Sequence, residues 1–332
     1  MEIAIVILNW NGKKLLEQFL PSITKFSSEK ASIYIADNAS SDNSISFIEN
    51  NYPSIKIIKN KTNGGYTKGY NDALKHIKAD IYCLINSDVQ VSENWLNPII
   101  NEFEKDKYIG VLQPKILDFN QKNKFEYAGA CGGYLDFFGY PYCKGRVFNT
   151  LEDDKSQFNE ISDIFWASGA CFFVKSEIFH DLNGFDEDYF AHQEEIDFCW
   201  RVKNYGYKIK VVPESKIYHV GGATLSNYNP KKTFLNFRNS LFNIVKNVPK
   251  KQFILVLLVR LILDGVAGVK FMLELRPRHT FAILKAHISF YRNILILFKK
   301  RKKIKNKVKY YNHSSIVIQY FLLGRKKFNQ LK

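Results

Sequence analysis

The sequence predicts an α/β protein with a mostly parallel central sheet, followed by a basic helical region. Over residues 1–113, short apolar segments alternate with amphipathic stretches, a rhythm that is typical of successive βαβ units. Charge then divides the chain: up to residue 230 there are 24 Lys and Arg against 30 Asp and Glu, and beyond it there are 24 against 2. We therefore expect one domain at 1–230, with halves 1–113 and 114–230, and a helical region at 231–332.

The predicted strands of the first half end in polar or small residues. These strands are residues 3–8, 32–37, 55–59, 81–86 and 108–113. The segment 81–86 is apolar without a break until Asn86, as expected for a strand that is buried on both faces of a parallel sheet. Because ligands of open α/β sheets bind at the carboxyl ends of the strands, the loops that follow predict a binding pocket at one edge.

Asp88 follows the central predicted strand and is the first candidate for chemistry. A carboxylate at this edge can hold a divalent cation, which in turn can hold a diphosphate; an Asp that caps a turn is the plain alternative. Asp37 is placed to accept hydrogen bonds from a ribose or a base, whereas Ser41 and Asp42 fit a helix cap better. The sequence lacks the G-x-G-x-x-G and Walker patterns, which argues against dinucleotide binding and ATP hydrolysis.

The second half contains an acidic helix and a histidine at a strand end. In the predicted helix, Glu194, Asp197 and Arg201 share one face, and Glu195 lies about a quarter-turn away. The helix dipole favours acids in a first turn, but the apolar residues that follow indicate that the helix is partly buried. His219 precedes two glycines at the end of a predicted strand and is a candidate metal ligand.

Other parts of this half carry weaker signals. Residues 208–212 and 215–220 are predicted as two strands, and a further strand follows the small residues 167–170. The aromatic residues between 127 and 140 could stack on a sugar, but packing under a long loop explains them better. The five cysteines are scattered and form no zinc spacing, which fits a reduced, cytoplasmic protein.

Eight short segments occur in order along the chain. They are I-V-I-L-N-W-N-G, A-D-N-A-S-S-D-N-S, N-G-G-Y-T-K-G-Y-N-D, L-I-N-S-D-V, S-G-A-C-F-F-V, G-F-D-E-D-Y-F, E-E-I-D-F-C-W-R and Y-H-V-G-G. Together, over about residues 1–225, they resemble the family 2 inverting glycosyltransferases, especially the rhamnosyltransferase-like and galactofuranosyltransferase-like members. The resemblance implies a GT-A fold, a nucleotide-diphosphate sugar as donor, and Mn²⁺ or Mg²⁺.

The resemblance also implies roles for individual residues. Donor contacts are expected from Asn9, Asp37, Asn38, Asn63, Gly65, Asn71, Asn86 and Ser87, and substrate contacts from Trp166, Gly169, Asp197 and Arg201. Asp88 and His219 would bind the metal, and Glu195 would be the general base, with Glu194 beside it. Two positions depart from the family pattern: Asn86 replaces the first acid of the D-x-D motif, and Glu195 stands where Asp is commoner.

The resemblance implies an inverting transfer of a sugar from dTDP-rhamnose or a UDP-sugar. The expected acceptor is a hydroxyl of a lipid-linked or cell-surface polysaccharide. The cation would neutralise the departing diphosphate, and Glu195 would accept the proton of the attacking hydroxyl. Two alternatives stay open: a catalytically inactive scaffold of the same fold, and a sugar nucleotidyltransferase.

The C-terminal region is basic and its pattern is helical. Residues 253–263 are very apolar, but Arg260, Asp264 and Lys270 interrupt the span, which predicts interfacial or packed helices in place of a transmembrane helix. The run K-K-R-K-K-I-K-N-K-V-K that begins at Lys299 suits an anionic membrane surface, with a solvated helix face as the alternative. We expect a peripheral protein at the cytoplasmic face of a bacterial inner membrane, with no nucleic-acid partner.

Overall fold

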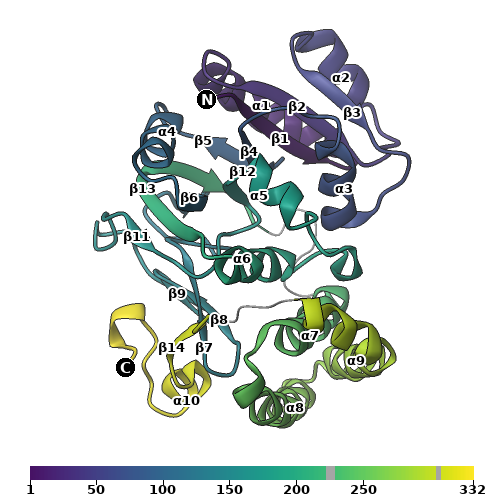
Figure 1. The fold of residues 1–332 in the computed structure, drawn as a ribbon, viewed down its shortest axis with the longest axis vertical. Helices are drawn as coiled ribbons and strands as arrows, with labels where there is room; N and C mark the ends of the chain where they lie inside the picture. The colour runs from purple at the N-terminus through teal and green to yellow at the C-terminus, as the bar shows by residue number, and fades with distance from the viewer. Residues whose placement is uncertain (222–228, 304–307) are drawn as a thin grey trace.

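A computed structural model describes residues 1–221, 229–303 and 308–332. Its large sheet contains β1 (Ile3–Asn9), β2 (Ser32–Asp37), β3 (Lys56–Lys59), β4 (Ile81–Asn86), β5 (Val89–Val91), β6 (Ile109–Asp118), β11 (Ser162–Asp163), β12 (Cys171–Lys175) and β13 (Lys208–His219). Within the described residues the strand order is β11-β13-β6-β12-β4-β1-β2-β3, with β5 beside β13 (Figure 1). β1 to β4 pair in parallel with one another, whereas β12 runs antiparallel to both β4 and β6.

Helices cover both faces of this sheet. They are α1 (Lys13–Ser27), α2 (Ser44–Asn51), α3 (Gly65–Leu74), α4 (Leu96–Lys105), α5 (Ser176–Asp181) and α6 (Glu194–Asn204). Side chains of β1 alternate between two cores: Ala4 and Val6 pack with residues of α3, α5 and α6, while Ile5 and Ile7 pack with residues of α1, α2 and α4. Because both faces are covered, the central strands are apolar throughout, as the sequence predicted.

One predicted strand boundary and one predicted strand break are wrong. β6 continues past Pro114 to Asp118, although its end was expected at residue 113. Residues 208–212 and 215–220 were expected as two strands, but they form the single strand β13. The pairing of β6 with β13 shifts register between Val212 and Lys216, and a proline is tolerated beside such an irregularity.

A second sheet forms mainly from residues 133–151, for which the sequence pattern predicted no strands. It contains β7 (Gly133–Asp136), β8 (Pro141–Cys143), β9 (Arg146–Val147), β10 (Thr150–Leu151) and, from the C-terminal segment, β14 (Tyr311–His313). The rings of Tyr134 and Tyr142 lie 5.7 Å apart, and both contact Phe328 at 5.5 and 6.0 Å. These aromatic residues are therefore packing residues, which is the favoured sequence interpretation.

The remaining helices lie at one end of the molecule (Figure 1). They are α7 (Pro230–Asn247), α8 (Lys250–Leu273), α9 (Pro277–Lys303) and the short α10 (Ile316–Phe321). α7 is held against the sheet domain by Lys246, whose Nζ lies 2.6 Å from Asp186 and 2.7 Å from Asp197. The division of the chain at residue 230 stays a prediction, because the segment after α9 returns to the second sheet through β14.

Candidate functional site

Asn9 and Asp37 lie side by side at the carboxyl ends of β1 and β2. Asn9 Nδ2 donates to Asp37 Oδ1 at 3.0 Å and to Ser44 Oγ at 3.0 Å, and Asp37 also accepts from the Ser40 backbone N–H at 3.0 Å. Both side chains are buried. Asn9 Oδ1 is buried and has no hydrogen-bond partner among the described residues, so it is an acceptor that a ligand could use.

The loop before α3 is shaped by asparagines and a glycine. Asn38 Nδ2 donates to the carbonyl of Gly65 at 2.8 Å, and Asn63 Oδ1 accepts from the Gly65 N–H at 3.0 Å. Gly65 has φ +73°, and a Cβ there would lie 2.5 Å from the Phe190 carbonyl oxygen. Only glycine therefore fits this position, and it brings the start of α3 to the same edge as Asn9.

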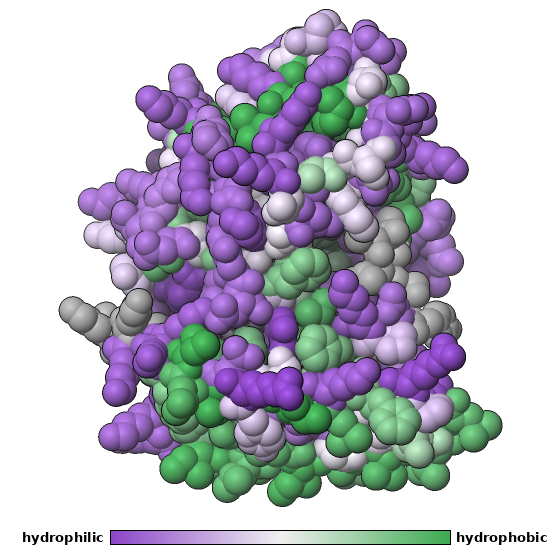
Figure 2. Space-filling model, turned by 90° about the vertical axis from the view of Figure 1, so that its right-hand side faces the viewer, coloured by the Kyte–Doolittle hydropathy of each residue, from purple (hydrophilic) through white to green (hydrophobic). Residues whose placement is uncertain are grey.

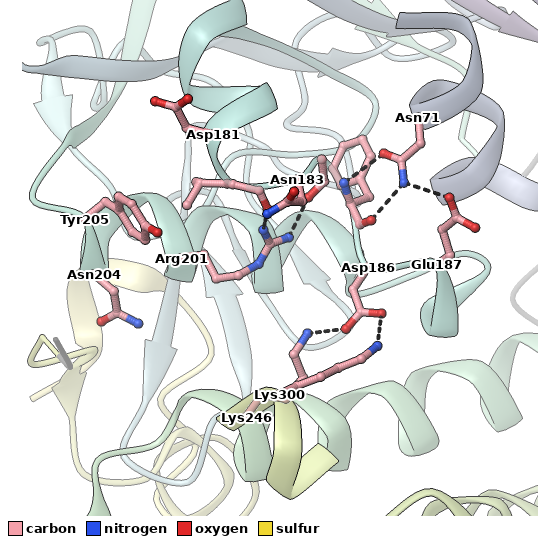
Figure 3. Close-up of a pocket in the computed structure, with 13 residues that line it drawn as sticks. Asn71, Asp181, Asn183, Asp186, Glu187, Arg201, Asn204, Tyr205, Lys246 and Lys300 are labelled. Atoms are coloured by element: carbon pink, nitrogen blue, oxygen red, sulfur yellow. Dashed lines mark hydrogen bonds and ion pairs between the residues drawn. The ribbon is translucent and has the colours of Figure 1, made fainter. Parts of the chain in front are cut away.

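Asn71, on α3, forms hydrogen bonds with the segment at Phe185 to Glu187, away from the edge that holds Asn9 and Asp37. Its amide donates to the Phe185 carbonyl and accepts from the Phe185 N–H, both at 2.9 Å, and it also donates to Glu187 at 3.2 Å (Figure 3). The side chain thereby holds the segment that carries the G-F-D-E residues. The predicted contact between Asn71 and the donor stays a prediction.

Asp88 and His219 meet at the end of β4, where β13 pairs with β5. His219 Nε2 lies 3.1 Å from Asp88 Oδ1, and His219 Nδ1 lies 3.2 Å from Glu126 Oε2. All three side chains are buried. Burial opposes a charge on the ring, but Glu126 and then Asp88 raise the pKa of His219 to about 10. Asn86, the other position of the motif, is half-buried beside them.

This donor set fits a divalent cation that is shared with a diphosphate. Adjacent ligands of an octahedral cation with bonds of ~2.1 Å lie about 3 Å apart, which is the separation of Asp88 Oδ1 and His219 Nε2. Glu126 faces the other ring nitrogen, as outer carboxylates do at histidine metal sites. The described residues contain no cluster of three or more His, Cys, Asp or Glu that could hold a metal by itself, so substrate oxygens would complete the coordination. A cation would take the place of the proton on His219.

Glu194 and Glu195 begin α6, immediately after Gln193 in a left-handed conformation. Burial and the neighbouring Glu195 raise the pKa of Glu194 well above its ordinary value. Burial raises the pKa of Glu195 to about 7. The Oε2 atoms of Glu194 and Glu195 are both buried and have no hydrogen-bond partner among the described residues. Burial thus favours the neutral form of Glu194, the more buried of the two, whereas Glu195 can exchange a proton near neutral pH.

Gly169 and Trp166 lie near this helix but are not equally accessible. The Tyr66 hydroxyl donates to the Gly169 carbonyl at 2.9 Å. The Trp166 side chain is 2% exposed and donates from Nε1 to the Tyr134 carbonyl at 2.9 Å. A Cβ at Gly133 would lie 2.1 Å from the indole ring. Trp166 is therefore packed in the core between the two sheets.

Asp197 and Arg201 also have structural partners. Asp197 is fully buried and lies 2.9 Å from Arg201 Nε and 2.7 Å from Lys246 Nζ. Arg201 donates to the carbonyls of Leu182 and Gly184, both at 2.8 Å. These contacts join α6 to α7 and to the loop after α5. No contact with a substrate follows from this geometry.

One cavity borders that junction. It has a volume of about 470 Å³, and its lining includes Asn71, Glu187, Arg201 and Tyr205 but not Asp88, Glu195 or His219. Figure 3 shows Lys246 and Lys300 converging on Asp186, with Nζ to carboxylate distances of 2.6 and 2.5 Å. Because its lining contains none of Asp88, Glu195 and His219, we interpret this cavity as a junction between helices.

The sequence from β1 to α5 decides the family. A model of the family described as "Glycosyl transferase family 2" matches residues 4–182, more than half of the chain. The chain belongs to glycosyl transferase family 2. It is accordingly a glycosyltransferase with the mixed α/β sheet of the GT-A fold, as the resemblance of the eight segments predicted.

Relatives of this family 2 chain include a rhamnosyltransferase and a hexosyltransferase. It is 23% identical, over 65% of its length and 75% of the relative, to N-acetylglucosaminyl-diphospho-decaprenol L-rhamnosyltransferase of Mycobacterium tuberculosis. It is 20% identical to the low-salt glycan biosynthesis hexosyltransferase Agl10 of Haloferax volcanii, over 72% and 74% of the two chains. Among solved structures, S. aureus TarS 1–349 in complex with UDP-GlcNAc superposes with a TM-score of 0.56 at 14% identity, covering 91% and 92% of the chains.

Two buried charged residues near this site carried no signal in the sequence. Glu126 and Arg146 lie outside the predicted strand ends and outside the eight segments. Glu126 reaches His219 only because the chain after β6 folds back over β13. A periodic pattern cannot identify such a residue, because its partner lies far away in the sequence.

Proposed function

We propose that this family 2 enzyme transfers a sugar, with inversion and metal assistance, from a nucleotide-diphosphate donor to a hydroxyl of a glycan acceptor. The observation that carries the proposal is the pair Asp88 and His219 at 3.1 Å, in a fold that also buries a carboxyl group, Glu195, with a pKa of about 7. The rhamnosyltransferase and hexosyltransferase relatives support dTDP-rhamnose or a UDP-sugar as donor and a lipid-linked or cell-surface polysaccharide as acceptor.

In this proposal each predicted residue has one task. Asn9 and Asp37 hold the nucleoside, the loop at Asn63 and Gly65 approaches the donor, and Asp88 with His219 holds the cation. Bound there, Mn²⁺ or Mg²⁺ would neutralise the charge that develops on the leaving diphosphate.

The protein groups then complete the transfer. Glu195 accepts the proton of the acceptor hydroxyl as this hydroxyl attacks the sugar on the face opposite the diphosphate. Attack from that face inverts the anomeric centre. Asn38, Asn86, Ser87 and Gly169 border the same edge. We assign positioning roles to Asn71, Trp166, Asp197 and Arg201, in place of direct substrate contacts, because their polar atoms are used within the protein.

A nucleotide-sugar panel tests this function. We expect UDP-, dTDP- or GDP-sugars of one class to raise the Tm when Mn²⁺ is present, because a ligand at 100 times its Kd stabilises a protein by ~2.7 kcal/mol. Addition of EDTA should remove most of the shift. Absence of any shift with all three classes would contradict the proposal and favour the inactive scaffold, and pyrophosphate release from a nucleoside triphosphate and a sugar phosphate would favour a nucleotidyltransferase.

α8 is built with its apolar side outward, which supports a membrane location. Its buried stripe includes Arg260 and Asp264, which are 3% and 0% exposed, whereas Ile262 and Val266 are 67% and 60% exposed. By length and composition, α8 and α9 could each cross a membrane. However, Arg260 donates to the Phe138 carbonyl at 3.1 Å and to Ser240 at 2.7 Å, so one side of α8 is fixed to the protein.

The exposed apolar side chains form one band. Figure 2 shows it along the end of the molecule that holds α8 to α10, with hydrophilic residues above it. Its members include Ile254, Leu258, Ile262, Val266, Val269, Leu273, Phe281, Leu284, Ile288, Leu295, Phe321 and Leu322. We propose that this band lies in the cytoplasmic leaflet of a bacterial inner membrane, with the basic residues of the C-terminal region at the anionic headgroups.

A flotation experiment checks the membrane proposal. We expect the full chain to float with vesicles that contain phosphatidylglycerol, and to remain bound at about 1 M salt, where the Debye length is ~3 Å and charge attraction is screened. The double variant Leu258→Asp, Ile262→Asp should sediment, since burial of each side chain contributes roughly 1.5–3 kcal/mol. The control Tyr108→Ser removes an exposed ring outside the band and should float normally; equal flotation of all three proteins would contradict the proposal.

A further inference from the structure

Arg146, on β9, is a buried cation that forms no ion pair within 4.0 Å with a carboxylate of the described residues. Its side chain is 6% exposed. Nη2 donates to Cys143 Sγ at 3.2 Å, and none of the described residues accepts a hydrogen bond from Nε. Burial raises the pKa of the Cys143 thiol, so this sulfur is neutral and does not balance the guanidinium. A buried charge without an oppositely charged partner destabilises a protein, unless a bound ligand supplies the opposite charge.

The side chains around Arg146 add positive charge and an aromatic face. The guanidinium carbon lies 4.9 Å from the centre of the Tyr127 ring, and Lys232 Nζ lies 5.9 Å from the same centre. Burial lowers the pKa of Lys232, which indicates that the ammonium is also partly desolvated. Both groups lie within 6 Å of one ring centre, and guanidinium and ammonium groups bind phosphate oxygens.

The nearest acid is already engaged elsewhere. Glu126 Oε2 lies 3.2 Å from His219 Nδ1 and accepts a hydrogen bond from the Ala128 N–H at 2.6 Å. Within the described chain no carboxylate oxygen approaches the Arg146 guanidinium to 4.0 Å. Cys143 also senses the charges of both Glu126 and Glu195. Against the effect of burial, the Glu126 carboxylate also raises the pKa of Arg146, so the guanidinium lies near the acid that faces His219.

We propose that Arg146, with Lys232 and Tyr127, forms a second anion subsite that binds a phosphate or diphosphate group of a reactant. The anion has two possible sources: the diphosphate of the nucleotide donor, or an anionic group of the acceptor, such as the diphosphate of a lipid-linked glycan. The identity of this reactant rests on the proposed function. That an anion binds here is inferred from Arg146 alone.

The test uses the full-length protein and two probes, inorganic pyrophosphate and the nucleoside diphosphates UDP, dTDP and GDP with Mn²⁺. Binding is measured by calorimetry for the wild type, Arg146→Gln and the control Lys144→Gln. Lys144 belongs to the same hairpin but donates to Ser162 at 2.6 Å. The Gln variant of Arg146 should weaken binding of one probe by about tenfold or more, as expected for loss of a charged hydrogen-bond donor, whereas the Lys144 variant should bind as the wild type does.

The pattern of loss identifies the source of the anion. If Arg146 holds the donor, the affinity for the nucleoside diphosphate falls and nucleotide competes with pyrophosphate. If Arg146 holds an acceptor group, the affinity for nucleotide is unchanged, the nucleotide-saturated wild type still binds pyrophosphate, and the variant loses this second binding. Unchanged affinity of Arg146→Gln for both probes would overturn the subsite, even with a lowered Tm. A wild type that binds pyrophosphate through Arg146 but no nucleotide would overturn the proposed donor and leave the subsite standing.

Discussion

Replacement of Glu195 by Gln is expected to lower kcat by about 10²–10⁴-fold, the usual contribution of a general base. The amide keeps the shape of the side chain but cannot accept the proton of the acceptor hydroxyl. Binding of the nucleotide sugar should persist, because the proposed donor contacts come from other side chains, including Asn9, Asp37 and Asp88. The measurement pairs steady-state transfer with the Tm shift by the donor.

The matched control is Glu194→Gln. Burial and Glu195 raise the pKa of Glu194 well above its ordinary value, which favours the neutral carboxyl group, and an amide has the shape of that group and no charge. Transfer should fall by less than about tenfold, within the range for loss of a single neutral hydrogen-bonding group. If transfer collapses in Glu194→Gln and survives in Glu195→Gln, the two roles are reversed.

The pH dependence follows from the same carboxyl group. A base must be deprotonated to act, and burial raises the pKa of Glu195 to about 7. The rate should therefore rise as pH increases through about 7 and reach a plateau above it. A profile that is already flat from pH 5 would show that another group is the base.

Replacement of Asp88 by Asn is expected to weaken metal-dependent donor binding by more than about 100-fold. Changes in the outer shell of a metal site already cost about 10–100-fold, and Asp88 is the only carboxylate of the D-x-D motif, since Asn86 occupies the other position. The amide removes the negative charge that faces His219 at 3.1 Å. The part of the Tm shift by donor that depends on Mn²⁺ should disappear, and any shift that remains should not respond to EDTA.

Asp118→Asn is the matched control for this variant. Asp118 ends β6, beside His219 in the pairing of β6 with β13. Its carboxylate accepts from the N–H groups of Asn120 and Gln121 at 2.8 and 2.7 Å, so it closes a turn. The variant should retain the metal-dependent shift. An Asp88→Asn protein that binds donor and metal as the wild type does would move the metal site to other residues.

Local patterns allowed much of the catalytic fold to be predicted. Apolar segments of strand length, separated by helical patterns, located β1 to β4 because both faces of a covered sheet select apolar residues. The same patterns placed Asn9, Asp37 and Asp88 at one edge, since parallel strands end together. They failed at β6 and β13. Pro114 indicated the end of a strand, but β6 continues past it, because the pairing of β6 with β13 shifts register there.

The sequence by itself determined the family, the order of the strands along the chain, and the residue types available at their ends. Only the tertiary structure decided which of those residues meet: Asp88 with His219 and Glu126, and Arg146 with Tyr127. The structure also showed that Trp166 and Asp197 are buried and use their polar atoms for contacts within the protein. The physical reason is that periodicity reports which face of an element is buried, whereas the partner of a buried polar group is set by packing between elements that are distant in sequence.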